Sequence, residues 1–185
     1  LMTKQIVSLD TETTSTNAID AELVGLSFSV EENKAFYVAI PKDREKALRI
    51  VNIFKSLYEE PSILKVGQNI KYDYEVLCNY GVRIGGKMWD TMLAHYIIQP
   101  ELKHNMDDMA EQVLHYKTIH IEELIGPKGK GQKNMADLKP EEIYEYAAED
   151  ADVTLKLKNV LQPKLKEVEG AKLFEDIEMP LVPVL

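Results

Sequence analysis

The chain changes its pattern near Gly67, and this change limits the folds open to it. Short apolar runs typical of β-strands come first, at residues 5–10, 23–30, 35–40 and 63–67. An amphipathic helix is expected among them, over 43–58, ending before Pro61. After Gly67 the apolar spacing is mostly helical, over residues 70–79, 90–98, 106–115 and 140–166. We therefore predict an α/β fold in which a mixed sheet is covered by helices.

Composition restricts the class of protein. The 185 residues, 45% of them hydrophobic and 29% charged, suffice for one well-packed domain. No apolar run approaches the roughly 18 residues of a membrane-spanning helix, and the N-terminus lacks a signal-peptide pattern. We expect a cytoplasmic monomer with no membrane partner. Cys78 is the only cysteine, which excludes an internal disulfide and a thiolate zinc site.

The formal net charge of −9 disfavours a protein that binds nucleic acid through a broad basic face. It does not exclude a nuclease. Carboxylates attract metal cations, and bound cations then attract phosphate, so the local charge of a site can be the opposite of the global charge.

Four carboxylates fall in three short phrases: Asp10 and Glu12 in S-L-D-T-E-T, Asp73 in G-Q-N-I-K-Y-D, and Asp150 in Y-A-A-E-D. Tyr146 lies four residues before the last of them. If these acids meet in space, they repel one another unless cations lie between them. The pattern therefore predicts a two-metal site for phosphodiester chemistry.

The spacing of the first pair suits an extended strand. Asp10 and Glu12 are two residues apart, so their side chains point to the same face, and Thr11 points to the other. The alternative is a solvated turn at a strand end, because so short a motif recurs by accident.

The other two phrases suit helices. Asn69 and Asp73 are four residues apart, as are Tyr146 and Asp150, and a helix places such pairs on one face. For Asp150, the alternative is a solvated surface acid in the stretch E-D-A-D.

The joint order D-x-E, N-x-x-x-D, Y-x-x-x-D resembles the DEDD family of 3′→5′ exonucleases, in its tyrosine subgroup. Further phrases, such as L-V-G-L-S-F, D-T-M-L-A-H-Y and I-E-M-P-L-V-P-V-L, resemble the proofreading domain of the bacterial DNA polymerase I family, nearly end to end. The resemblance implies a ribonuclease H-like fold, a mixed β-sheet flanked by α-helices. It also implies an excised domain: residues 1–175 as the exonuclease domain and 176–185 as the start of a junction to a polymerase domain outside this chain.

The resemblance further implies that Asp10, Glu12 and Asp150 surround one divalent ion. Asp10 would share a second ion with Asp73, directly or through water. Both ions would be Mg²⁺ or Mn²⁺, with Zn²⁺ possible at one site. Tyr146 and Glu12 would orient the attacking water.

The implied activity is the removal of deoxynucleotide 5′-monophosphates from single-stranded or frayed DNA 3′ ends, within a DNA-directed DNA polymerase. Two alternatives stay open: a spacer or DNA clamp that no longer cleaves, and a ribonuclease of the same superfamily.

Substrate contacts are also carried over by resemblance. Tyr72 is expected to stack on a base or sugar, although a core aromatic is the alternative. Thr16 and Met135 depart from the family, which often has leucine and an aromatic there, so the grip on terminal bases would be weaker. The candidate contacts are Thr11, Thr13, Thr16, Gln68, Asn69, Tyr72 and Met135.

Residues 126–134, G-P-K-G-K-G-Q-K-N, are too rich in glycine for a helix or strand. An exposed, mobile loop is expected there. Lys128, Lys130 and Lys133 are either phosphate contacts or simply solvated side chains.

The remaining polar candidates have simpler interpretations. Asp90 is expected to cap a helix rather than act as a fifth ligand, and Asp107 and Asp108 resemble first-turn helix acids. Asp152 is expected to be a solvated neighbour of the site. Surface or packing roles are expected for the histidines, His95, His104, His115 and His120.

Overall fold

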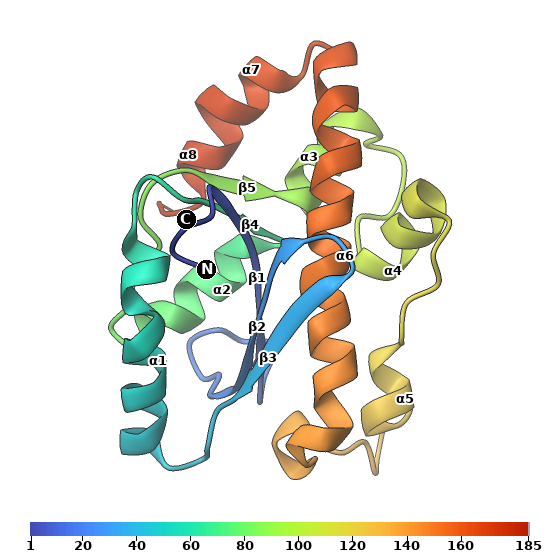
Figure 1. Cartoon of the computed structure of the whole chain (residues 1–185). Helices are drawn as coiled ribbons and strands as arrows, with labels where there is room; N and C mark the ends of the chain where they lie inside the picture. Colours follow the sequence, from blue (N-terminus) through green and yellow to red (C-terminus); the bar gives the residue numbers. More distant parts are fainter. Residues whose placement is uncertain (185) are drawn as a thin grey trace.

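A mixed sheet lies at the centre of the molecule (Figure 1). The computed structural model describes residues 1–184, and within them the strands form one five-stranded sheet in the order β3-β2-β1-β4-β5. The first three strands pair antiparallel, whereas β1 with β4 and β4 with β5 pair parallel. The strands are β1 (Ile6–Thr13), β2 (Leu23–Glu31), β3 (Lys34–Ala39), β4 (Leu64–Gly67) and β5 (Met88–Asp90).

Helices cover both faces of this sheet (Figure 1). The long helix α6 (Pro140–Glu167) crosses one face, and α1 (Arg44–Glu59) and α2 (Ile70–Cys78) lie against the other. Phe28 of β2 anchors the α1 side by stacking on Phe54, with ring centroids 5.2 Å apart. The other helical elements are α3 (Thr91–Ile98), α4 (Met106–Met109), the π-helical turn η1 (Ala110–Leu114), α5 (Ile121–Ile125), the 3₁₀ turn η2 (Met135–Asp137), α7 (Ala171–Leu173), the π-helical turn η3 (Phe174–Glu178) and α8 (Met179–Leu181).

The predicted mixed sheet flanked by helices is confirmed, with differences at short elements. The segment 106–115 is helical as predicted, but its second half has π-helical geometry and ends at His115, whose φ is 53°. Six elements were not predicted: β5, α5, η2, α7, η3 and α8. Each has three to five residues, too few for a periodic pattern, and β5 is defined only by its pairing with β4.

The glycine-rich loop contains no helix or strand between Gly126 and Asn134, as predicted. Gly129 and Gly131 have φ values of 137° and 105°, a region that residues with a Cβ rarely adopt. Elsewhere, no helix within residues 1–184 combines the length and apolar character needed to cross a bilayer.

The register between β1 and β2 determines which residues lie beside Asp10 and Glu12. Asp10 lies opposite Ser27, and Glu12 lies opposite Gly25. Because strand side chains alternate, these four residues share the face covered by α6. The ring of Tyr37 covers Gly25 on this face. The predicted orientation of the Asp10 and Glu12 pair therefore agrees with the strand geometry.

Candidate active site

Three of the four predicted acids meet between the sheet and α6. Asp10 and Glu12 of β1 and Asp150 of α6 have carboxylate oxygens that all lie within 4.8 Å of one another. Glu12 is 6% exposed and Asp150 is 8% exposed, so the solvated-turn and surface-acid alternatives are wrong. A cluster of hard carboxylate oxygens suits Mg²⁺ or Mn²⁺.

The electrostatics of this trio also suit a cation. Burial raises the pKa of Asp10 to about 6. Burial, and then the charges of its acidic neighbours, raise the pKa of Glu12 and of Asp150 well above the usual carboxyl range. Across residues 1–184, lysine or arginine ion pairs to these three acids are absent. At neutral pH the cluster therefore favours protons or a bound cation, and its residues fit a divalent metal.

Asp73 lies beside the trio rather than inside it. It is buried on α2, and Thr11 donates its hydroxyl proton to Asp73 Oδ1 at 2.6 Å. Burial and then the charge of Asp10 raise the pKa of Asp73, and the Thr11 hydrogen bond opposes that rise. Thr11 follows Asp10 on the strand, so its side chain points to the opposite face of the sheet, which is the face that α2 covers. The predicted helical pairing of Asn69 with Asp73 is wrong, since Asn69 precedes the helix in the left-handed conformation, with φ of 59°.

One buried carboxylate fixes the start of two helices near the site. Asp90 Oδ1 accepts hydrogen bonds from the backbone of Met92 at 2.8 Å and Leu93 at 3.1 Å, so it caps α3 as predicted. Its Oδ2 accepts another from the backbone of Ile70 at 2.7 Å, the first residue of α2. Asp90 thereby positions α2, which carries Asp73.

Tyr146 stands one helical turn before Asp150 on the inner side of α6. It is half-buried and packs in a cluster with Met135, Ile143 and Ala147. Burial and the nearby carboxylates raise its pKa above the ordinary phenol value, the charge of Asp150 being the largest electrostatic contribution. Tyr146 therefore keeps its proton and presents a hydrogen-bond donor to the acidic cluster.

Tyr37 belongs to the surroundings of the site but was not predicted. It lies opposite Ser27, which in turn lies opposite Asp10, so the three share one face of the sheet. Burial and then the charge of Glu12 raise the pKa of Tyr37 to about 12. A Cβ at Gly25 would lie 2.2 Å from the Tyr37 ring, so a larger residue there would displace this ring. The alternation of residues 35–39 against 25–29 is the sequence signal that would have located this tyrosine.

A cleft of about 460 Å³ opens beside Glu12. Tyr72 forms part of its wall, half-buried, with its hydroxyl 2.5 Å from Thr13 Oγ1 and bonded to the Ser15 carbonyl. The lining includes these predicted substrate contacts: Thr11, Thr13, Thr16, Asn69, Tyr72 and Met135. It also includes residues that were not predicted, among them Ile121 and Ile125 of α5.

Three other predicted contacts lie outside this lining, as far as residues 1–184 define it: Gln68, Lys128 and Lys130. Gln68 instead donates from Nε2 to the His104 carbonyl at 2.8 Å and accepts from the Thr91 hydroxyl, so it serves the scaffold. The two lysines are exposed on the glycine-rich loop, and the third loop lysine, Lys133, does line the cleft.

A larger hollow of about 860 Å³ adjoins the cleft and shares Thr14 and Asn134 with it. Its surface is mainly apolar and its lining lacks all four predicted acids within the part of the chain described. The carboxylates, rather than the size of the hollow, therefore assign the chemistry to the smaller cleft.

The prediction that Asp152 is a solvated neighbour of the site is wrong. Its side chain accepts a hydrogen bond from the backbone of Asn33 at 2.6 Å and pairs with Lys156 at 2.6 Å, so it anchors the β2–β3 turn to α6.

The expectation of packing roles for histidines holds for His95 and His104, whose Nδ1 atoms lie 2.8 Å apart. His95 is fully buried.

Comparison with known proteins decides the family. The sequence model of a family described as 3′-5′ exonuclease matches residues 1–166. The chain belongs to this 3′-5′ exonuclease family. Among its relatives, DNA polymerase I of Pseudomonas aeruginosa is 42% identical over 98% of this chain, which covers 21% of that protein. The 3′-5′ exonuclease domain thus spans about a fifth of the length of the curated relatives that it matches.

Solved structures confirm the fold of the 3′-5′ exonuclease domain. Brucella melitensis NrnC superposes with a TM-score of 0.78 at 22% identity, over 98% of this chain and 82% of that chain. Escherichia coli RNase D, an exoribonuclease involved in structured RNA processing, gives a TM-score of 0.65 at 17% identity, over 94% and 44%. The ribonuclease H-like fold predicted from the motifs is therefore present.

Proposed function

We propose that this domain is a metal-dependent 3′→5′ exonuclease that removes deoxynucleotide 5′-monophosphates from single-stranded or frayed DNA 3′ ends. The observation that supports it best is the meeting of Asp10 with the buried Glu12 and Asp150, of which Glu12 lines a cleft. Buried carboxylates without counter-charges destabilise a fold, so their presence together is best explained by metal binding.

In this proposal Asp10, Glu12 and Asp150 hold one divalent ion, and Asp10 and Asp73 hold a second, directly or through water. The metal is Mg²⁺ or Mn²⁺, with Zn²⁺ an option at one position. Such ions would supply Lewis acidity for a water nucleophile and for the leaving 3′ oxygen.

The protein's own groups orient the reaction. Tyr146 retains its proton, so it donates a hydrogen bond to the attacking water rather than removing a proton from it. Glu12 accepts from the same water, and Thr11 keeps Asp73 in place through its hydrogen bond. Removal of the Tyr146 hydroxyl therefore impairs orientation and leaves metal binding in place.

The residues that line the cleft bind the DNA strand. Tyr72 and Asn69 contact the terminal bases and sugars, which suits any sequence because every base has an aromatic face. Thr13, Thr16, Met135 and the backbone near them complete the contact surface. Lys128 and Lys130 meet phosphates of the strand where it leaves the cleft.

Two kinds of relative suggest two substrates. The 42% identity to a DNA polymerase I favours DNA, whereas the likeness to RNase D, at 17% identity, concerns the fold alone. A ribonuclease is therefore the second candidate. A third candidate, a spacer or DNA clamp without activity, conflicts with the retention and burial of the acids.

The relatives also suggest a larger context. We propose that residues 1–175 form the exonuclease domain and that 176–185 begin a junction to a polymerase domain, which would be its partner in the same chain. The domain would act in the cytoplasm as a monomer, without a membrane partner.

The test uses 5′-labelled single-stranded DNA and RNA of matched sequence, with Mg²⁺ or Mn²⁺. We expect a ladder of DNA shortened from the 3′ end, which a chelator abolishes. Equal or faster cleavage of the RNA would contradict the assignment to DNA. Absence of cleavage together with absence of divalent binding would instead favour the spacer.

A further inference from the structure

The wall of the cleft formed by α5 has little packing of its own. Ile121 and Ile125 line the cleft, yet none of the five residues of α5, all within the described chain, is fully buried. A helix of this length is not stable by itself in water. Leu124 and Ile125 pack, only partly buried, against the cluster of Met135 and Ile143. The position of α5 therefore depends on this packing together with contacts made by the segments next to it.

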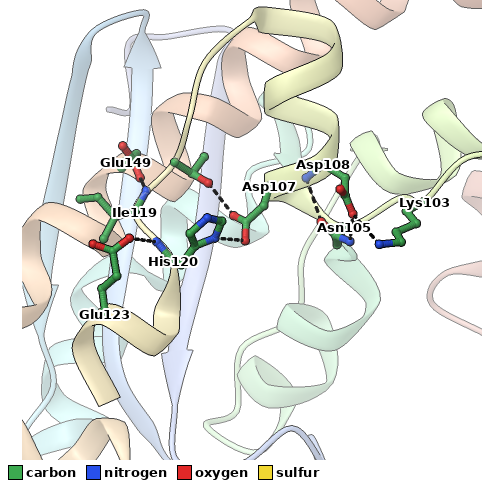
Figure 2. A network of polar contacts seen from close by, with 9 residues as sticks. Lys103, Asn105, Asp107, Asp108, Ile119, His120, Glu123 and Glu149 are labelled. Carbon is green, nitrogen blue, oxygen red and sulfur yellow. Dashed lines mark hydrogen bonds and ion pairs between the residues drawn. The ribbon is translucent and has the colours of Figure 1, made fainter. Parts of the chain in front are cut away.

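The segment that leads into α5 is held on one side by Asp107 (Figure 2). Thr118 donates its hydroxyl proton to Asp107 Oδ1 at 2.6 Å, and His120 Nδ1 lies 2.7 Å from Asp107 Oδ2. Asp107 belongs to the first turn of α4. Both of its oxygens are therefore used to attach residues 118–120 to that helix.

The same segment is held on its other side by Glu149 of α6. Ile119 donates its backbone proton to Glu149 Oε2 at 2.7 Å (Figure 2), and the Tyr116 hydroxyl donates to Oε1 at 2.6 Å. We call Asp107 and Glu149, with these four donors, the carboxylate clamp. Hydrogen bonds to ionised carboxylates are stronger than neutral ones, so the clamp fixes the backbone just before Ile121.

We propose that the carboxylate clamp positions α5 and thereby sets how tightly the cleft holds the terminal nucleotide. The inference rests on the proposed exonuclease function. Asp107, Thr118 and Glu149 are positioning residues, because the cleft lining, as defined by residues 1–184, includes none of them. Their influence reaches the substrate through Ile121 and Ile125.

The expected kinetic signature follows from where α5 lies. Its side chains contact the base or sugar, away from the acids that act on the phosphate. A contact made equally in the ground state and the transition state changes KM and leaves kcat unaltered. Loss of a hydrogen bond in the carboxylate clamp should therefore raise KM for single-stranded DNA without lowering kcat.

Thr118 offers a matched pair of variants. Thr118→Val keeps the shape of the buried side chain and removes the hydroxyl, whereas Thr118→Ser keeps the hydroxyl. Asp107→Asn weakens the contact to His120, and its neighbour Asp108 provides the control Asp108→Asn. Asp108 bonds with Asn105 and pairs with Lys103 at 3.7 Å, outside the clamp (Figure 2).

The experiment measures steady-state kinetics on a single-stranded DNA oligonucleotide and hydrogen exchange of residues 121–125 in the same proteins. We expect Thr118→Val and Asp107→Asn to raise KM about fivefold, the effect of losing one such hydrogen bond, with kcat unchanged. Exchange in α5 should accelerate in both. Thr118→Ser and Asp108→Asn should match the wild type in both measurements.

An unchanged KM in Thr118→Val, or a fall in kcat with KM unchanged, would overturn the proposal. Unaltered exchange of residues 121–125 in Thr118→Val would overturn it as well. If the wild type cleaves no 3′ end, the proposed function fails instead, and the exchange comparison between Thr118→Val and Thr118→Ser still tests the clamp by itself.

Discussion

The acidic cluster and the α5 wall of the cleft are built in opposite ways. The acids stand on a central strand and on a helix of 28 residues, with Glu12 and Asp150 buried and Asp10 partly buried. The wall consists of a five-residue helix and a glycine-rich loop, largely exposed and held by polar contacts together with the partly buried Leu124 and Ile125. The difference teaches that this fold fixes the proposed catalytic groups through its core and leaves the proposed contact with the nucleic-acid strand to surface segments. Changes to the two regions should therefore have separable effects.

The largest effect is expected from the shared ligand. Asp10→Ala removes an oxygen donor proposed to contact both ions, so we expect cleavage to fall by about 1000-fold or more. Gel analysis of a 5′-labelled oligonucleotide measures this. Asp176→Asn, a change at an exposed acid of η3, serves as the control and should leave the rate intact. Retained cleavage by Asp10→Ala would contradict the assignment of the acidic cluster as the catalytic region.

Tyr146→Phe should have an intermediate effect within the same region. The ring still packs on Met135 and Ile143, so the fold persists, but the hydrogen bond proposed to orient the attacking water is removed. We expect kcat to fall about 10- to 100-fold with little change in KM. A change confined to KM would instead place Tyr146 with the binding wall.

The acidic cluster should also cost stability when no metal is bound. Burial raises the pKa of Asp10 to about 6, so the folded protein binds more protons than the unfolded chain between the unfolded pKa and that value. Stability of the metal-free domain therefore falls as pH rises through this range. We expect its Tm to be lower at pH 7.5 than at pH 5.5 by about 3–6 °C.

Asp10→Asn sharpens that prediction, because it removes one charge without removing volume. It should raise the Tm of the metal-free domain at pH 7.5 and reduce the additional stabilisation by Mn²⁺. Calorimetric scans at the two pH values measure both quantities. A lower Tm for Asp10→Asn at pH 7.5 would show that the cluster is not under electrostatic strain.

The smallest effect is expected at the exposed loop. Replacing Lys128 and Lys130 by alanine together should raise KM about two- to threefold and make binding less dependent on salt, with kcat unchanged. Titration of labelled DNA at two ionic strengths measures this. An effect on kcat would mean that the loop reaches the chemical centre.

The sequence was sufficient for four of the five strands, the long helices and the meeting of Asp10, Glu12 and Asp150. D-x-E on a strand fixes two side chains on one face by local geometry, so their orientation follows from alternation alone. The assignment of Asn69 to a helical face failed because α2 begins only at Ile70. The carboxylate of Asp90, 21 residues later, accepts hydrogen bonds from the backbone of Asn69 and Ile70 and so fixes this start. Tyr37 and Ile121 were missed because only strand register and the closure of distant segments bring them to the site.

Titration of the domain with Mn²⁺ by calorimetry at pH 7.5, in the wild type and in Asp10→Ala, tests the central claim most directly. We predict binding of divalent ions to the wild type, with protons released from the acidic cluster, and loss of that binding in the variant. Absence of binding in the wild type, or equal binding in both proteins, would contradict the proposal that these buried acids form a metal site.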